Sequence, residues 1–247
     1  MGPNEPLDNL AWHALAGPHA HLGEGGGRAV RYHPDVAIFG ALPHEPQADD
    51  WGALAEVVGP GEAATLFRDE VREPDGWERM LTIPARQMVA TDVDGRLDPE
   101  AIDLGPADVE EMLGLVAATK PGPFGRRTVE LGGYVGIRDD QGRLVAMAGH
   151  RLRAAGVVEL SAVCTDERHR GRGLGTRLVR HVVARAAADG DTVVLHAASD
   201  NMGAIRLYEA LGFTHRRAIE AAAVRAPGRP AVADTPVALD ACAAADS

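Results

Sequence analysis

The chain lacks the features that several classes of protein depend on. Its two cysteines, Cys164 and Cys242, are too few for a disulfide scaffold, and no C-x-x-C pair suggests a zinc site. Apolar runs of roughly 18 residues are missing, so no membrane span is expected. The N-terminal residues show no basic stretch followed by an apolar one, so we expect no secretory signal and a cytoplasmic location.

Positive charge is also scarce. The 25 lysine and arginine residues are outnumbered by 36 acidic residues, which gives a net charge of −11, and Lys120 is the only lysine. This balance argues against nucleic acid as a partner, because binding phosphate backbones needs a basic face. It is compatible with a cationic amine as substrate. The strong preference for arginine suggests the GC-rich coding of a bacterial genome.

The first part of the chain, residues 1–105, reads as an N-terminal domain. All three tryptophans (Trp12, Trp51 and Trp77) lie there, which favours a core of its own. The apolar patterns predict a helix at 51–58 and strands at 36–39, 63–68, 77–83 and 87–90. His13, His19 and His21 have no companion ligands at metal-site spacing, so a loop is the better interpretation. The acidic, turn-rich segment 91–105 predicts the boundary.

Residues 106–225 predict a second domain with a more regular pattern. Pro106 opens a helix in which Val109, Met112, Leu113 and Val116 mark one buried face. Strands are expected at 132–138, 144–150, 157–164, 192–197 and 218–224, and helices at 173–188 and 199–211. Ser199 or Asp200 would cap the last helix and Gly212 would end it. The breaker-rich loop 120–127 is a candidate substrate loop, and residues 226–247 predict a flexible tail.

One stretch carries the clearest chemical signal. Gly171, Gly173 and Gly175 alternate directly before the helix at 173–188, so backbone can approach a ligand without a Cβ in the way. The free N–H groups of that helix and its dipole favour an anion. A dinucleotide fingerprint would need glycine at Thr176, and a P-loop would need a lysine that the turn lacks. The pattern does match R-x-x-G-x-G, from Arg168 and again from Arg170.

A second block lies at Asn201–Phe213, separated from Gly175 by 25 residues, and reads N-x-x-A-x-x-L-Y-E-x-L-G-F. With both blocks in this order, residues 106–225 resemble the GNAT superfamily of acyl-CoA-dependent N-acyltransferases. The resemblance implies an α/β fold with a mixed, mostly antiparallel sheet flanked by helices. The N-terminal α+β domain would be additional. It could be a degenerate second copy of the fold, shape the acceptor site or mediate pairing into a homodimer.

The resemblance also implies a reaction and a set of residues. An acetyl group would pass directly from acetyl-CoA to a primary amine, without a metal. The carbonyl oxygen would be held by backbone N–H among Val163, Cys164 and Thr165. Tyr208 would protonate the leaving thiolate and Asn201 would bind the pantetheine arm, although packing and helix capping are the alternatives. The pyrophosphate would lie on the turn, at Arg170, Gly171, Arg172, Gly173, Leu174, Gly175 and Thr176.

Three routes for removing the proton of the amine stay open. Glu159 shares a strand face with Val163, His196 lies on the neighbouring strand with a side chain that ordinarily titrates near neutral pH, and water could relay the proton. Cys164 is better interpreted as a buried strand residue than as a nucleophile. The acceptor is a small-molecule or peptide amine that the sequence does not identify. The competing interpretation is a non-catalytic acyl-CoA-binding regulatory or partner module.

Overall fold

The computed structural model describes residues 5–228, so most of the predicted tail, and Cys242 with it, lies outside the described residues. Helices are α1 (Glu5–Asp8), α2 (Leu10–Leu15), α3 (Ala48–Val58), α4 (Val109–Thr119), α5 (Leu174–Ala188) and α6 (Met202–Leu211). Strands are β1 (Gly23–Gly26), β2 (Ala29–Tyr32), β3 (Gly40–Ala41), β4 (Ala63–Arg68), β5 (Glu78–Ala90), β6 (Ile102–Asp103), β7 (Val135–Arg138), β8 (Leu144–Ala154), β9 (Val157–Thr165), β10 (Thr192–Ala198) and β11 (Phe213–Arg225).

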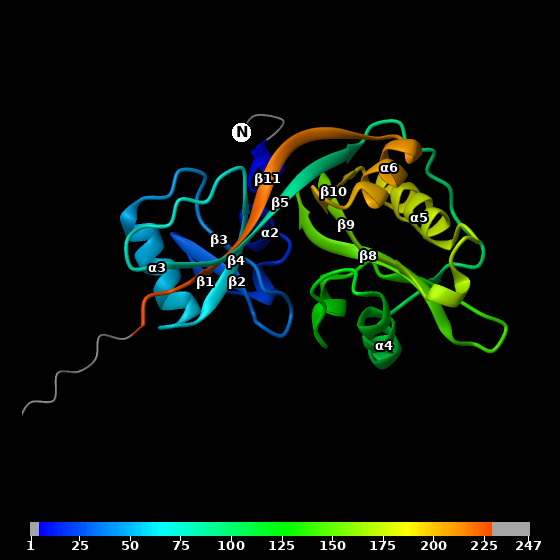
Figure 1. The fold of residues 1–247 in the computed structure, drawn as a ribbon, viewed down its shortest axis with the longest axis horizontal. Helices are drawn as coiled ribbons and strands as arrows, with labels where there is room; N and C mark the ends of the chain where they lie inside the picture. The colour runs from blue at the N-terminus through cyan, green and yellow to red at the C-terminus, as the bar shows by residue number, and fades with distance from the viewer. Residues whose placement is uncertain (1–4, 229–247) are drawn as a thin grey trace, which may run out of the picture.

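An eight-stranded sheet organises the molecule, in the order β4-β11-β5-β10-β9-β8-β7-β6. Every neighbouring pair in it is antiparallel except β9 and β10. This confirms the predicted mixed, mostly antiparallel sheet. Helices α5 and α6 lie along its right-hand part, and β1–β3 form a small second sheet beside α3 on the left (Figure 1).

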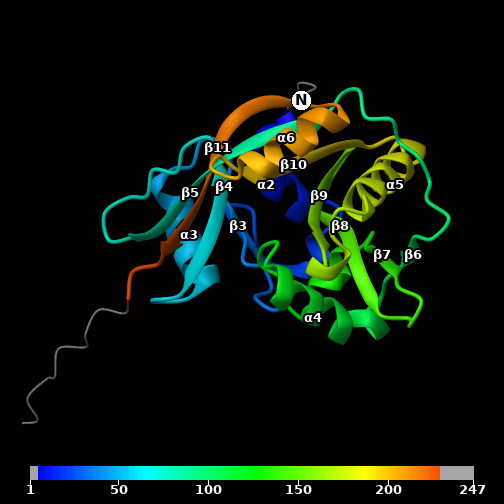
Figure 2. The same cartoon turned by 45° about the vertical axis from the view of Figure 1, so that its right-hand side comes forward.

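The large sheet crosses the predicted domain boundary near residue 105. Strand β5 is hydrogen-bonded between β10 and β11, and β4 pairs with β11. Strands β5 and β11 run side by side from one half of the molecule to the other (Figure 2). The tryptophan-containing core of α3 likewise includes Ala222 and Val224 from β11. A division at residue 105 would therefore cut through both a sheet and a core.

Several predicted elements differ in detail from the structure. Residues 36–39 form a turn in which only Phe39 makes a bridge, so the predicted strand is wrong there. The two strands expected at 77–83 and 87–90 are one strand, β5, which continues through Pro84. Pairing with β10 begins only at Ala85, so the β5–β10 ladder does not need the N–H that Pro84 lacks. Asn201, and neither Ser199 nor Asp200, caps α6, since its Oδ1 accepts a hydrogen bond from Ala204 N at 3.1 Å.

The main core lies between α5 and the sheet. Leu178, Val179 and Val182 of α5 are fully buried against residues of β7–β10, and Phe213 and Ile205 close this core near α6. Burial of these aliphatic side chains fixes α5 across the strands, and with it the glycine turn that precedes the helix. None of the helices within residues 5–228 has the length and apolar composition needed to cross a membrane.

Candidate active site

A cleft opens where two parallel strands separate. Strands β9 and β10 are paired from Val157–Thr192 to Glu159–Val194, and beyond this point the ladder stops. Both strands continue, and their ends form the walls of a cleft of about 920 Å³. The end of α4 and the first turns of α6 complete the walls. The separation leaves backbone groups of β9 facing a cavity instead of a strand, which suits a ligand that needs hydrogen-bond donors.

A bulge in β9 bends the strand at this point. Met147 pairs with Cys164 and Gly149 with Ser161, so Ala162 and Val163 together oppose a single residue of β8. Ala162 has φ of 54°, a left-handed conformation that normally favours glycine. Lys120, with φ of 51°, is the other non-glycine residue of this kind among the described residues, and both line the cleft. Backbone strain of this kind collects at functional sites.

The strand ladder decides which N–H groups of β9 reach the cleft. Asp166, directly after β9, donates its N–H to the carbonyl oxygen of Val145 on β8 at 2.8 Å, so these two residues are a hydrogen-bonded pair of the ladder. Alternation along an antiparallel ladder then directs the N–H of Cys164 toward β8 and that of Thr165 toward the open edge. Of the three residues predicted to hold the thioester oxygen, Thr165 therefore has a donor on the cleft side.

The glycine turn supplies further donors beside the cleft. Gly171 and Gly173 have φ of 76° and 73°, and Gly173 is the N-cap of α5, which no side chain caps. Gly175 lies against the end of β9: a Cβ there would come within 3.7 Å of Thr165 Oγ1 and Val163 Cγ1. The first N–H groups of α5 are thus free of side-chain caps and positioned for an anion.

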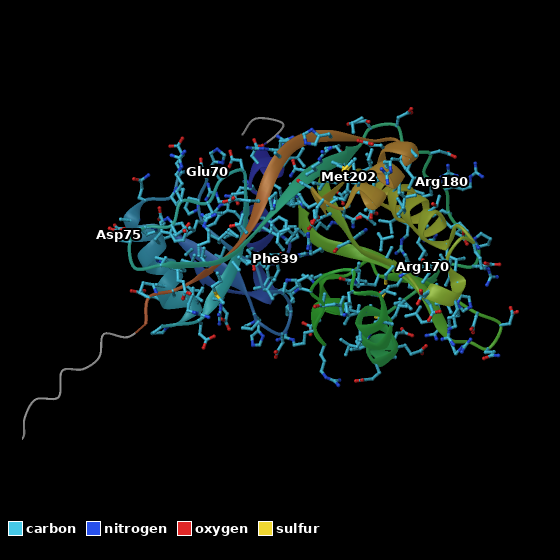
Figure 3. The ribbon with its side chains drawn as sticks, in the orientation of Figure 1. Phe39, Glu70, Asp75, Arg170, Arg180 and Met202 are labelled. Atoms are coloured by element: carbon cyan, nitrogen blue, oxygen red, sulfur yellow. The ribbon has the colours of Figure 1, made fainter. Side chains whose placement is uncertain are left out.

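Two arginines of the glycine turn line two different cavities. Within residues 5–228, Arg168 pairs with Asp166, while no ion pair involves Arg170 or Arg172. Arg170, labelled in Figure 3 in the turn between β9 and α5, lines the cleft with Gly175. Arg172 and Leu174 line a separate pocket of about 400 Å³ on the other side of the turn. Gly171, Gly173 and Thr176 line neither cavity.

Tyr208 and Asn201 of α6 both line the cleft, as does Cys164. The Tyr208 ring packs edge-on against Phe213 at 5.5 Å, and burial raises the pKa of Tyr208 to about 12. A phenol in this environment stays protonated at neutral pH and can donate a proton. Burial also raises the pKa of the Cys164 thiol, which disfavours the nucleophilic thiolate.

Glu159 lies beneath the floor of the cleft and does not line it. Its carboxylate is fully buried and binds two groups: Arg151 on β8, whose Nε donates to Oε2 at 2.9 Å, and His196, whose Nδ1 lies 2.6 Å from Oε1. Burial alone would raise the pKa of Glu159, but the charge of Arg151 and the contact with His196 outweigh it and lower the pKa to about 2.

His196 lines the cleft, and its hydrogen bonds define its tautomer. Gln87 Oε1 accepts from Arg216 Nη1 at 2.7 Å, so Gln87 Nε2 is the atom that lies 3.0 Å from His196 Nε2. That amide nitrogen can only donate, and His196 Nε2 must therefore accept. The ring proton is then on Nδ1, directed at Glu159. Both nitrogens of His196 and both oxygens of Glu159 are thus already engaged.

Sequence reasoning missed Arg151 and Gln87, and it included Lys120 only as the first residue of the candidate substrate loop 120–127. The signal for Arg151 was present, since a carboxylate within an apolar strand needs a cation, and the turn at 154–156 places Arg151 near Glu159 across the hairpin. Gln87 comes from β5, whose position between β10 and β11 no local pattern indicates. Among residues 5–228, no group of three or more histidine, cysteine or acidic side chains is arranged to hold a metal ion.

Comparisons with known proteins agree with this geometry. The sequence profile of the FR47-like protein family matches residues 134–222. The chain is similar to a structure from Novosphingobium aromaticivorans described as an acetyltransferase of the GNAT family: the sequences are 39% identical, the match covers 89% of this chain and 97% of that chain, and the TM-score is 0.80. A GCN5-related N-acetyltransferase from Kribbella flavida shares the fold, with 23% identity over 92% of this chain and 97% of that chain and a TM-score of 0.60. No curated protein matches the sequence.

Proposed function

The chain belongs to the GNAT family of acetyltransferases, and from this premise we propose that it transfers an acetyl group from acetyl-CoA to a primary amine by direct attack. The observation that carries the proposal is the cleft between β9 and β10. Backbone donors, an uncapped helix N-terminus and a protonated tyrosine all meet there.

Binding of the cosubstrate would use the turn and the open strand edge. The N–H groups of Leu174, Gly175 and Thr176 at the start of α5 would bind the pyrophosphate, and Arg170 would add positive charge. Asn201 caps α6 through its Oδ1 and keeps its Nδ2 group for the pantetheine arm. Among the described residues, neither Asp nor Glu lines the cleft, so no carboxylate would repel the phosphates.

The chemistry would then proceed at the end of β9. The amine nitrogen attacks the thioester carbon, and the N–H of Thr165 stabilises the negative charge that develops on oxygen. The carbon–sulfur bond breaks, and Tyr208 gives its proton to the leaving thiolate. The attacking nitrogen loses its second proton to water in the cleft as the amide forms, and that water returns a proton to Tyr208. The product amide then leaves with free CoA as the second product.

Removal of the ammonium proton is best explained by water. Glu159 is buried and holds its charge against Arg151, and both ring nitrogens of His196 are hydrogen-bonded. Either group would have to break an existing bond to accept a proton. We therefore propose that water in the cleft carries the proton away, with His196 and Glu159 as positioning residues that fix the cleft wall.

A thiol-release assay tests this function. Acetyl-CoA is offered with a panel of amines while CoA binding is measured separately by calorimetry. We expect amine-dependent release of free thiol together with an acetylated amine in the mass spectrum. Binding of CoA without thiol release by any amine would instead support a non-catalytic acyl-CoA-binding module.

A further inference from the structure

A second, smaller pocket adjoins the cleft. It has a volume of about 200 Å³ and lies between residues 34–39 of the N-terminal part and the loop 123–131. Arg151 lines both this pocket and the cleft, so the two cavities share this residue as a common wall. The loop that follows α4 also spans both, since Lys120, Pro121 and Gly122 line the cleft and Pro123, Phe124 and Gly125 line the pocket.

Hydrogen bonds between distant segments build this pocket. Thr128 Oγ1 donates to Val36 O at 2.7 Å and accepts from Gly125 N at 2.8 Å. Arg127 N donates to Asp35 O at 3.2 Å. A Cβ on Gly125 would come within 2.9 Å of Asp35 O, so the two segments approach as closely as glycine allows. The walls are therefore held in place by the fold of the N-terminal part.

The surface of the pocket is apolar and aromatic. Phe39, labelled in Figure 3 near the middle of the molecule, packs edge-on against Phe67 at 5.1 Å. Phe124 packs in the same way on Tyr134 at 5.4 Å. Val36, Ile38 and Leu131 add aliphatic surface. A volume below the roughly 300–1,000 Å³ of sites for drug-sized ligands fits a single apolar side chain.

The charged side chains that line the two cavities are all positive. Arg151 is the one charged residue in the pocket, Lys120 and Arg170 are in the cleft, and neither Asp nor Glu lines either cavity within residues 5–228. A polycationic acceptor would find no counter-charge. Arg151 Nε and Nη2 bind Glu159, while its Nη1 makes no hydrogen bond to a described residue. This nitrogen is a donor available to a ligand oxygen.

We propose that the pocket selects the acceptor, and that the acceptor is a free α-amino acid with an apolar, preferably aromatic, side chain. This inference rests on the proposed acetyltransferase function. The side chain fills the pocket between Phe39 and Phe124, and the α-amino group points into the cleft. The carboxylate is bound by Lys120 and by Nη1 of Arg151, since a carboxylate is the group that paired cationic donors recognise best.

Three amines test separately whether the site recognises the aromatic ring, the carboxylate or positive charge. L-Phenylalanine has the ring and the carboxylate, phenethylamine has the ring alone, and spermidine has only positive charge. We expect kcat/KM to fall at least about tenfold from phenylalanine to phenethylamine and further to spermidine, because each loses contacts that the site supplies. Equal rates for phenylalanine and phenethylamine, or preference for spermidine or for a peptide amine, would overturn the assignment.

Paired surface substitutions test the pocket itself. Ile38 and Met80 are similarly exposed, at 45% and 47%, but only Ile38 lines the pocket. We expect Ile38→Glu to raise KM for phenylalanine about tenfold or more without changing the Kd for CoA, and Met80→Glu to change neither. Lys120→Gln should raise KM for phenylalanine but leave phenethylamine unaffected.

The outcomes distinguish this inference from the function on which it rests. If spermidine or another amine is acetylated but phenylalanine is not, the amino-acid assignment is wrong and the acetyltransferase function stands. If CoA binds and no amine releases thiol, both are wrong. An unchanged KM for phenylalanine in Ile38→Glu, with Met80→Glu as control, would show that the pocket does not hold the side chain.

Discussion

Glu159 and Arg151 form a buried ion pair. The sequence draws attention to the first residue but not to the second. Glu159 stands out in the sequence as a carboxylate in an apolar strand. Its partner Arg151 lies across the local β8–β9 hairpin, whereas its partner His196 comes from β10 and reaches it only in the folded sheet. His196 likewise has a partner from a distant strand, since Gln87 of β5 lies against its second ring nitrogen.

Removing the carboxylate charge should destabilise the fold. Glu159→Gln leaves the guanidinium of Arg151 buried without a counter-ion, so we expect a loss of about 3–5 kcal/mol at pH 7. Urea unfolding measures it. Glu78→Gln is the control, because Glu78 pairs with Arg225 on the surface and the loss should stay within about 1 kcal/mol. A Glu159→Gln protein as stable as the wild type would contradict the role of the pair.

The same variant should show a particular dependence on pH. The pKa of Glu159 is lowered from its ordinary value of 4.5 to about 2. Its contribution is therefore complete above pH 4.5 and is lost as pH falls toward 2. We expect the stability difference between wild type and Glu159→Gln to shrink over this interval. A difference that is already absent at pH 6 would mean that the carboxylate is not held by Arg151.

A single substitution can test the proposed chemical role of Tyr208. Tyr208→Phe keeps the packing on Phe213 and removes the proton, so kcat should fall about 100-fold or more while the Kd for CoA stays nearly unchanged. Tyr32→Phe is a suitable control, since that phenol binds His19 outside the cleft. Comparable losses in kcat and CoA affinity for Tyr208→Phe would assign the tyrosine a packing role.

At the scale of elements, the sequence predicted most helices and strands because their patterns are local. The strand at 63–68, the helix across 51–58 and the hairpin before β9 all follow from periodicity and turn residues. The bulge at Ala162 could not be predicted, because alanine rarely adopts positive φ and nothing in the neighbouring residues demands it. The β9–β10 ladder, whose end opens the cleft, stops at Glu159, shortly before that bulge.

The glycine turn should tolerate a side chain poorly. Gly171 has φ of 76°, so Gly171→Ala is expected to cost about 1–2 kcal/mol of stability and to weaken CoA binding. Gly114 lies within α4 with open space around it, and Gly114→Ala should instead stabilise the protein by up to about 1 kcal/mol. Thermal unfolding and calorimetry measure both quantities. Unchanged CoA affinity in Gly171→Ala would mean that the turn does not bind the cosubstrate.

For the whole molecule, the resemblance predicted the type of sheet, but local patterns did not indicate that strands from before residue 105 belong to it. Strand β5 lies more than 100 residues from β10 and β11 in the sequence, yet it is hydrogen-bonded between them. Local periodicity describes a strand but does not indicate its partner. The N-terminal part therefore contributes three strands, β4, β5 and β6, to the large sheet and, through residues 34–39, one wall of the pocket beside the cleft.

Two buried histidines link the stability of the whole molecule to pH. Burial lowers the pKa of His19 and of His150 to about 4. Because both pKa values lie below the ordinary 6.5, the unfolded chain binds more protons between these limits, and stability falls as pH drops from 6.5 to 4. Thermal unfolding between pH 7.5 and 4 should show this decline. The double variant His19→Gln, His150→Gln should flatten it, and an equally steep decline there would contradict this origin.

Direct transfer within a single ternary complex is the central claim, and initial-rate kinetics test it most directly. Thiol release is measured while acetyl-CoA and an accepted amine are both varied. Under the proposed mechanism both substrates bind the cleft before any chemistry occurs and no residue is acetylated, so double-reciprocal lines should intersect. Parallel lines, which indicate a covalent acetyl-enzyme, or thiol release that does not depend on the amine, would contradict the account.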